Sequence, residues 1–251
     1  MPYVTAGYPS FGAMPGILDM LRDAGADCLE LGVPFSDPVA DGVTIQASSQ
    51  AALEGGATPE RCLRVAERAA RLGHRVVLMS YANPLLRGGL RASARRIVAA
   101  GVAGIIVPDL PLEEARGWSE AFAHAGVAQV LMAAPTTPGA RLRAIDRATR
   151  GFLYYVSLTG VTGERRRLPA GLAVRLRALR RDVAHPVCVG FGVSTPAQAA
   201  AVARPADVVI VGSALVRRLA GWGGGRAERR SIARWAASMA DAVHGAKGAI
   251  E

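Results

Sequence analysis

Two carboxylates stand eleven residues apart in the segment 29–42, which reads Leu-Glu-Leu-Gly-Val-Pro-Phe-Ser-Asp-Pro-Val-Ala-Asp-Gly. Glu30 falls inside an apolar run typical of a buried strand, whereas Asp41 ends a loop punctuated by prolines. Burying an ionised carboxylate costs free energy because the charge loses its hydration. A glutamate at such a position usually has an ion-pair partner or a chemical use for its proton. Two carboxylates in unlike environments can form an acid/base pair, so Glu30 and Asp41 are candidate catalytic residues.

A recurring pattern predicts the elements that position them: an Ala-rich amphipathic helix, a Gly that ends it and a short apolar run. Runs of about five residues without full polar alternation are typical of parallel strands covered by helices. Eight such runs occur, at 3–6, 27–31, 76–79, 104–107, 128–132, 152–156, 187–189 and 207–211. They predict one α/β domain over residues 1–251, a (β/α)8 TIM barrel. An open doubly wound sheet is disfavoured because no Gly-x-Gly-x-x-Gly follows the first run.

The two ends of the chain differ from the usual barrel. The first strand begins directly after Met1, so the helix that normally precedes it is lacking and the N-terminal face is expected to be more exposed. A last helix is expected near 228–243, followed by a flexible tail after about residue 244.

Glycines follow the last three predicted strands. The segments are 160–163 (Gly-Val-Thr-Gly), 190–192 (Gly-Phe-Gly) and 212–213 (Gly-Ser). Loops after strands seven and eight are the usual phosphate site of such barrels, and glycines let backbone N–H groups approach phosphate oxygens. Three clusters in register favour a phosphate site over simple turn chemistry. Its expected members are Gly163, Gly190, Gly192, Gly212 and Ser213.

Other side chains at or just beyond strand ends could line the rest of the pocket: Tyr81, Tyr154, Ile45, Phe191, Ile106 and Met132. For Ile106 and Met132, ordinary core packing is the favoured interpretation. Thr162 lies in the glycine-rich loop after strand six and is counted with the substrate-binding residues. Asp109, in a tight loop after strand four, is interpreted as a cap or loop anchor.

Several other functions are disfavoured. The four histidines fall before strands or in the tail, and no Cys/His/carboxylate set has metal-ligand spacing or completes a Ser/His/Asp triad. Cys28, Cys62 and Cys188 are expected to be reduced and largely buried. Without an apolar run for a membrane span or a signal segment, we expect a cytoplasmic protein. The net charge of +10 comes mostly from arginines along predicted helices, and aromatics are only 5%. This indicates solvated helix faces rather than a nucleic-acid site, and the positive surface favours an anionic substrate or an acidic partner.

The segment 29–42 resembles the signature of the tryptophan synthase α-subunit family. Segments 3–9, 81–83, 108–111, 160–163, 190–192 and 212–213 extend the match in order, so the resemblance covers nearly the whole chain. It implies a (β/α)8 barrel that cleaves indole-3-glycerol phosphate into indole and glyceraldehyde 3-phosphate by a retro-aldol reaction.

The resemblance also implies residue roles. The glutamate matched by Glu30 is the general acid/base, and the aspartate matched by Asp41 holds the indole N–H. The tyrosine matched by Tyr154 lies close to the glycerol chain. The family's phosphate groups match Gly163, Gly192 and Ser213, with Phe191 beside them.

The family partner is a pyridoxal-phosphate β subunit in an α2β2 heterotetramer, and the α subunit itself uses no cofactor. Loops 32–44 and 157–168 are expected to face that partner. The chain departs from the family in lacking the first helix, in having Val43 where Pro is common, and in the basic segment 165–167. Two alternatives stay open: a stand-alone indole-3-glycerol phosphate lyase, and a catalytically weak scaffold that activates a β subunit.

Overall fold

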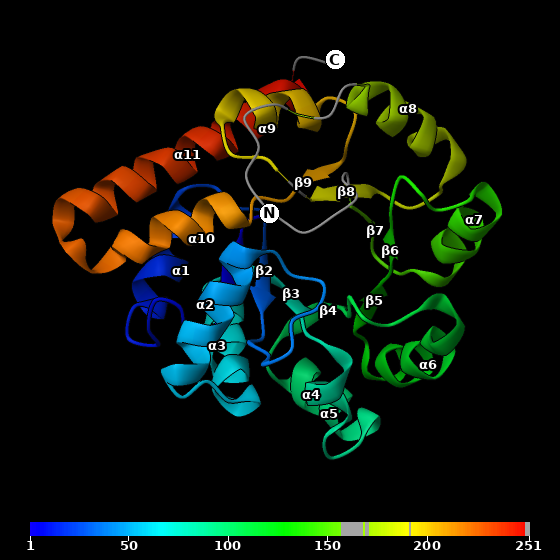
Figure 1. The fold of residues 1–251 in the computed structure, drawn as a ribbon, viewed down its shortest axis with the longest axis horizontal. Helices are drawn as coiled ribbons and strands as arrows, with labels where there is room; N and C mark the ends of the chain where they lie inside the picture. The colour runs from blue at the N-terminus through cyan, green and yellow to red at the C-terminus, as the bar shows by residue number, and fades with distance from the viewer. Residues whose placement is uncertain (157–167, 169–170, 191, 249–251) are drawn as a thin grey trace.

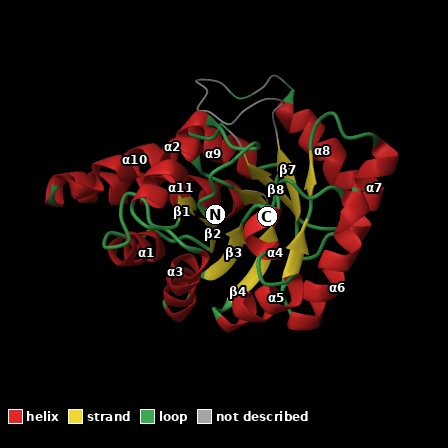
Figure 2. Ribbon diagram, turned by 60° about the horizontal axis from the view of Figure 1, so that its bottom comes forward, coloured by secondary structure: helices red, strands yellow, loops and turns green. Residues whose placement is uncertain are grey.

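A ring of short parallel strands forms the centre of the molecule, and helices surround it (Figures 1 and 2). The computed structural model describes residues 1–156, 168, 171–190 and 192–248. The strands within this part are β1 (Tyr3–Thr5), β2 (Cys28–Gly32), β3 (Arg75–Met79), β4 (Val102–Ile106), β5 (Ala128–Val130), β6 (Met132–Ala133), β7 (Leu153–Val156), β8 (Val187–Gly190) and β9 (Val208–Val209).

All described strand pairs are parallel, in the orders β1-β2-β3-β4-β5 and β6-β7-β8-β9. Two junctions close the ring. A parallel bridge joins Pro2 to Val211, where Tyr3 N–H donates to the Val211 carbonyl at 3.0 Å. At the other junction, the two sheets meet where β5 is followed after one residue by β6. These two short strands occupy the place of the single strand predicted at 128–132. The predicted (β/α)8 barrel is therefore confirmed.

The break between β5 and β6 is caused by a side chain that is distant in sequence but adjacent in space. Leu131 N–H donates to the side-chain oxygen of Thr149 at 2.9 Å instead of to a neighbouring strand. Thr149 is fully buried and its hydroxyl donates to the Phe152 carbonyl, also at 2.9 Å. A threonine side chain thus replaces one ladder bond, which satisfies the backbone but interrupts the sheet.

The helices are α1 (Met14–Asp23), α2 (Val43–Glu54), α3 (Pro59–Arg71), α4 (Ala82–Leu86), α5 (Leu90–Ala99), α6 (Ala115–Ala125), α7 (Gly139–Ala148), α8 (Leu172–Asp182), α9 (Pro196–Ala203), α10 (Ser213–Leu219) and α11 (Arg226–Gly248), with 3-10 turns η1 (Leu112–Glu114) and η2 (Ala220–Gly224). Sequence signals set several boundaries. Thr195 and Gln198 form a capping box at the start of α9. Gly126 ends α6 in the left-handed conformation that glycine adopts without strain. None of the described helices is both long and apolar enough to cross a membrane.

Strand alternation separates the core into an outer and an inner part. On β2, Leu29 and Leu31 belong to the cluster between strands and helices, and each is fully buried. Burying such side chains stabilises the fold by about 1.5–3 kcal/mol each, which helps to offset the cost of turning Glu30 inward. The inner cluster consists of Tyr3, Ile45, Val77, Ile106, Val130, Tyr154, Cys188, Ile210 and Val216. The core interpretation of Ile106 is therefore confirmed.

The C-terminal helix is longer than predicted. α11 continues to Gly248, and Ala246 is buried. His244 also lies 3.0 Å from the carboxylate of Asp27. Helix α11 therefore continues past the end predicted near residue 243, and the flexible tail after about residue 244 stays a prediction. At the opposite end of the barrel from the strand C-termini, Met1 and Pro2 border a pocket of about 510 Å³ between α1 and α11.

Candidate active site

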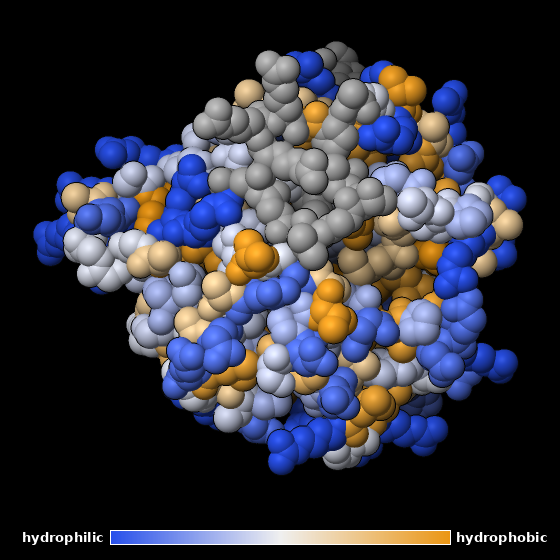
Figure 3. Space-filling model, in the orientation of Figure 1, coloured by the Kyte–Doolittle hydropathy of each residue, from blue (hydrophilic) through white to orange (hydrophobic). Residues whose placement is uncertain are grey.

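A pocket with an empty volume of about 680 Å³ opens at the C-terminal ends of the strands. Its described lining comprises Tyr3, Glu30, Ala40, Asp41, Ile45, Met79, Pro108, Met132, Tyr154, Gly192, Val193, Ile210, Gly212, Ser213 and Ala214. On the face seen in Figure 3, hydrophobic groups lie among hydrophilic ones, and hydrophilic groups cover much of the surrounding helices. Both carboxylates singled out from the sequence lie in this pocket, at the end of a TIM barrel where catalytic residues are found.

Glu30 has an unusual environment. It is 1% exposed, and neither carboxyl oxygen has a hydrogen-bond partner among the described residues. Burial raises the pKa of Glu30 to about 8, and the negative charge of Asp41 adds to the rise while the Met1 ammonium opposes it. Glu30 is therefore mostly protonated at neutral pH and can donate a proton into the pocket.

Asp41 lies at the end of the β2–α2 loop and is 8% exposed. Burial raises the pKa of Asp41 to about 6, and a hydrogen bond from the Tyr81 hydroxyl lowers it. The Asp41 backbone is fixed from both sides: its N–H donates to the Pro38 carbonyl at 3.0 Å, and its carbonyl accepts from Gln46 Nε2 at 2.8 Å. At neutral pH, Asp41 is mostly ionised, whereas Glu30 is mostly protonated. At this pH, Glu30 is thus mostly neutral and Asp41 mostly carries a negative charge.

Tyr81 lies outside the described pocket lining. Its hydroxyl accepts a hydrogen bond from Ala40 N–H at 3.0 Å, besides bonding to Asp41. Phe35 stacks on its ring with centroids 5.2 Å apart. The structure therefore places Tyr81 behind Asp41, where it supports the loop, rather than on the pocket wall where the sequence placed it.

The predicted wall residues Tyr154 and Ile45 do line the pocket, and both are nearly fully buried. Met132 also lines it, although sequence reasoning favoured core packing for this residue. Tyr3 was missed. Its strand register places it directly beside Glu30, so the inward-facing alternation of β1 was the signal that could have found it. Met79, Pro108, Val193 and Ile210 were missed too, because apolar residues at strand ends resemble core residues in sequence.

The glycines of the predicted phosphate site divide into three groups. Gly192, Gly212 and Ser213 line the pocket. Gly190 does not, and a Cβ there would lie 2.6 Å from the Tyr154 hydroxyl oxygen. Glycine at 190 therefore lets Tyr154 lie against β8. Thr162, Gly163 and Phe191 lie outside the described residues.

Two further predictions concern residues outside the pocket. Asp109 accepts a hydrogen bond from Ala82 N–H at 2.9 Å, which confirms its role as an anchor at the start of α4. Cys28, Cys62 and Cys188 are free, and only Cys28 is partly exposed. Among the residues that the structure describes, no three His, Cys, Asp or Glu side chains are grouped as metal ligands.

The barrel and the two carboxylates in its pocket define an acid–base enzyme of the TIM-barrel class. Residues 1–244 match the family model of the tryptophan synthase alpha chain, and the chain belongs to this family. The tryptophan synthase alpha chain of Chloroflexus aurantiacus is 48% identical over 221 residues, which are 87% of this chain and 83% of that protein. Its counterpart in Geobacter sulfurreducens is 45% identical over 216 residues, 86% of this chain and 82% of the relative.

Solved structures of the family have the same fold. A chain of Mycobacterium tuberculosis tryptophan synthase superposes with a TM-score of 0.87 at 39% identity, covering 96% of this chain and 91% of that one. A chain from the tryptophan synthase α2β2 complex of Pyrococcus furiosus gives a TM-score of 0.87 at 37% identity, covering 97% and 96%.

Proposed function

We propose that this chain is a tryptophan synthase α subunit that cleaves indole-3-glycerol phosphate into indole and glyceraldehyde 3-phosphate. The observation that carries the catalytic assignment is the environment of Glu30, a buried acid without a described hydrogen-bond partner that faces the same pocket as Asp41. The high pKa keeps its proton available at neutral pH, which the first step of such a cleavage requires.

In the proposed mechanism, Glu30 donates its proton to C3 of the indole ring. Asp41 accepts a hydrogen bond from the indole N–H and stabilises the positive charge that develops on the ring. The Glu30 carboxylate then removes the proton of the glycerol 3′-hydroxyl. The electron pair of that O–H bond forms the aldehyde C=O, the C–C bond to the ring breaks, and its electrons neutralise the indole. Glu30 ends the cycle protonated.

The phosphate is proposed to lie at Gly192, Gly212 and Ser213, which line the same pocket as the carboxylates. The described lining contains no Lys or Arg side chain. At these three residues, backbone N–H groups and the Ser213 hydroxyl are the donors proposed for the phosphate. Gly163, Thr162 and Phe191 belong to the same proposal on the strength of the family resemblance. Tyr154 and Ile45, which line the pocket, are proposed to enclose the substrate.

The proposal includes a β subunit as partner, because a chain with the same fold comes from an α2β2 complex described as mutually activating. Val39, on the loop before Asp41, and Val43, the first residue of α2, are each 71% exposed, and exposed apolar side chains next to a pocket are typical of a contact surface. Pyridoxal phosphate is assigned to that partner and no cofactor to this chain. A cytoplasmic location is proposed from the three free cysteines.

Indole release by the purified chain, alone and with a β subunit, tests the function. We expect cleavage in both conditions, faster with the partner, and none above background for Glu30→Gln. Equal cleavage by Glu30→Gln and the unaltered protein would refute the assignment of the acid. Full activity with no response to a β subunit would support a stand-alone lyase, and activation of a β subunit without cleavage would support a scaffold.

A further inference from the structure

Two helices meet beside the pocket. α2 begins directly after Asp41 and contributes Ile45 from its first turn, while α10 begins at Ser213 and contributes Ala214. The two helices contact one another, and both contact β1 (Figure 1). One side of the pocket is thus formed by the first turns of two helices that are far apart in the sequence.

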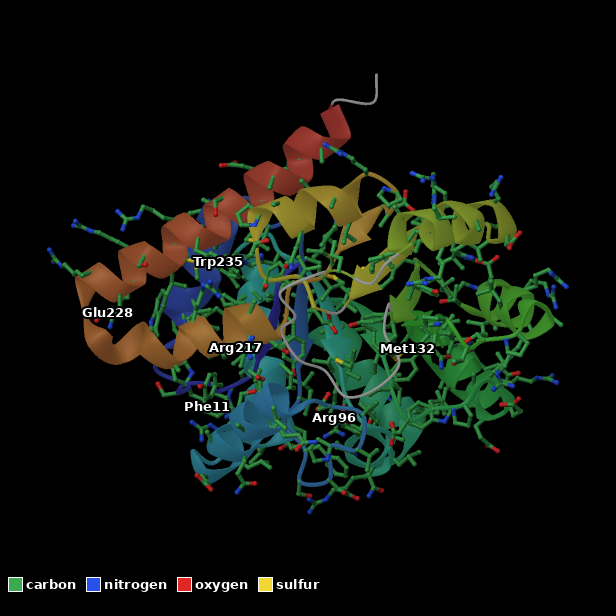
Figure 4. The ribbon with its side chains drawn as sticks, turned by 45° about the horizontal axis from the view of Figure 1, so that its top comes forward. Phe11, Arg96, Met132, Arg217, Glu228 and Trp235 are labelled. Atoms are coloured by element: carbon green, nitrogen blue, oxygen red, sulfur yellow. The ribbon has the colours of Figure 1, made fainter. Side chains whose placement is uncertain are left out.

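A hydrogen bond links the first turn of α2 to the second turn of α10. Arg217 Nη1 donates to Thr44 Oγ1 at 2.9 Å, across 173 residues of sequence. Thr44 comes three residues after Asp41, and Arg217 comes one turn after Ser213. Figure 4 shows Arg217 on α10, on the side of the barrel that α2 occupies.

Ser48 holds α2 against β1, because its hydroxyl lies 2.7 Å from that of Thr5, but the start of the helix has no side-chain cap. Its N-cap is Gly42, which supplies no side-chain acceptor for the first N–H groups. Val43, the first helical residue, is 71% exposed and buries little apolar area. Gln46 ties the turn back to the Asp41 carbonyl, but within the same segment. The bond from Arg217 instead connects this turn to a different helix.

We propose that Arg217 is a positioning residue for the cleavage reaction: by holding Thr44, it fixes the first turn of α2 and with it Asp41 and Ile45 relative to the wall formed by α10. The inference rests on the proposed function and adds a residue to it. Arg217 is exposed and Thr44 is partly exposed, so solvent weakens the bond and its effect is moderate.

Removing either partner tests the bond. Thr44→Val keeps the shape of the side chain but loses the acceptor, and Arg217→Met keeps the length but loses the donor. Thr44→Ser restores the hydroxyl. Gln50→Ala is the matched control, because it removes an exposed hydrogen bond to Glu54 from the same helix, away from its first turn. Amide hydrogen exchange of the 42–48 segment, kcat and KM for indole release, and the thermal midpoint are measured for each protein.

We expect Thr44→Val and Arg217→Met each to speed exchange in the 42–48 segment and to lower kcat by about three- to tenfold, with KM changed less than about twofold. Thr44→Val should add nothing in the Arg217→Met background, because the bond is already lost. Thr44→Ser and Gln50→Ala should behave like the unaltered protein, and the thermal midpoints should stay close together.

Unchanged exchange in Thr44→Val, or full additivity of the two substitutions, would overturn the inference. If Thr44→Val and Arg217→Met exchanged faster but kept an unaltered kcat in an active enzyme, the bond would be only a structural contact. That result would also overturn the inference. If the unaltered protein did not cleave indole-3-glycerol phosphate at all, the proposed function would fail with the positioning role, while the exchange measurements would still support the link between the helices.

Discussion

The hydroxyl group of Tyr81 is hydrogen-bonded to the Asp41 carboxylate and accepts a hydrogen bond from the neighbouring Ala40 N–H. One phenol thus fixes both the side chain and the backbone of the loop that carries Asp41. The bond favours the ionised form of this carboxylate, which the proposed mechanism requires for stabilising the indole nitrogen.

Tyr81→Phe should make cleavage more sensitive to acid. Loss of the hydroxyl removes an interaction that lowers the pKa of Asp41, so this pKa should rise above its present value of about 6. A larger fraction of Asp41 is then protonated at a given pH, and the acid limb of the kcat/KM profile should shift to higher pH. We expect a loss of about tenfold at pH 6 and a smaller loss at pH 8. A pH–rate profile that coincides with that of the unaltered protein would show that Tyr81 does not set the charge of Asp41.

Asp41→Asn should impair catalysis without unfolding the protein. The amide keeps the size of the side chain but cannot supply the negative charge opposite the developing indolium, so kcat should fall by about 10²–10³. Steady-state indole release measures the loss, and circular dichroism provides the folding control. Retention of more than about a tenth of kcat would contradict the assigned electrostatic role.

Glu30→Gln should change how stability depends on pH. Since the pKa of Glu30 is raised to about 8 in the folded protein, from 4.5 when unperturbed, the folded state holds a proton that the unfolded state releases between these values. Unaltered protein therefore loses stability as pH rises through this window, by about 3 kcal/mol at pH 7. Glutamine does not titrate, so the free energy of unfolding of the variant should rise relative to that of the unaltered protein from pH 5 to pH 8. Urea unfolding at several pH values measures the difference, and parallel curves would exclude the raised pKa.

Gly190→Ala should disturb the pocket through Tyr154. The added Cβ would lie 2.6 Å from the Tyr154 hydroxyl oxygen, which forces the ring to move. We expect a loss of about 1–3 kcal/mol in the free energy of unfolding, together with slower cleavage. Gly212→Ala is the comparison for stability alone, because a Cβ there would make only an ordinary 3.6 Å contact with Tyr3. Adding Tyr154→Phe to Gly190→Ala should recover part of the stability; if it recovers none, the clash is not with the hydroxyl group.

The barrel and its two carboxylates could be predicted because helix–glycine–strand repeats and a charged residue in an apolar run are local signals. The division of strand 128–132 could not, because it depends on Thr149, eighteen residues beyond Leu131. Tyr81 was predicted at a strand end as a pocket-wall residue and instead supports the Asp41 loop, since sequence gives the end of a strand but not the direction of a side chain. The packing role of Gly190 could not be predicted, because a glycine needed for close packing and one needed for ligand approach look alike in sequence.

The bridge from Pro2 to Val211 has a consequence for folding during synthesis. The first strand pairs early with β2 but must wait for its second neighbour, made more than two hundred residues later. The ring therefore cannot close until residues near Val211 have left the ribosome. Until then, β1 and the newest strand both expose unpaired backbone edges, which are sites for pairing with other chains. Contacts so distant in sequence also slow folding. Barrel closure is therefore the stage at which this chain is most open to aggregation or to the help of a chaperone.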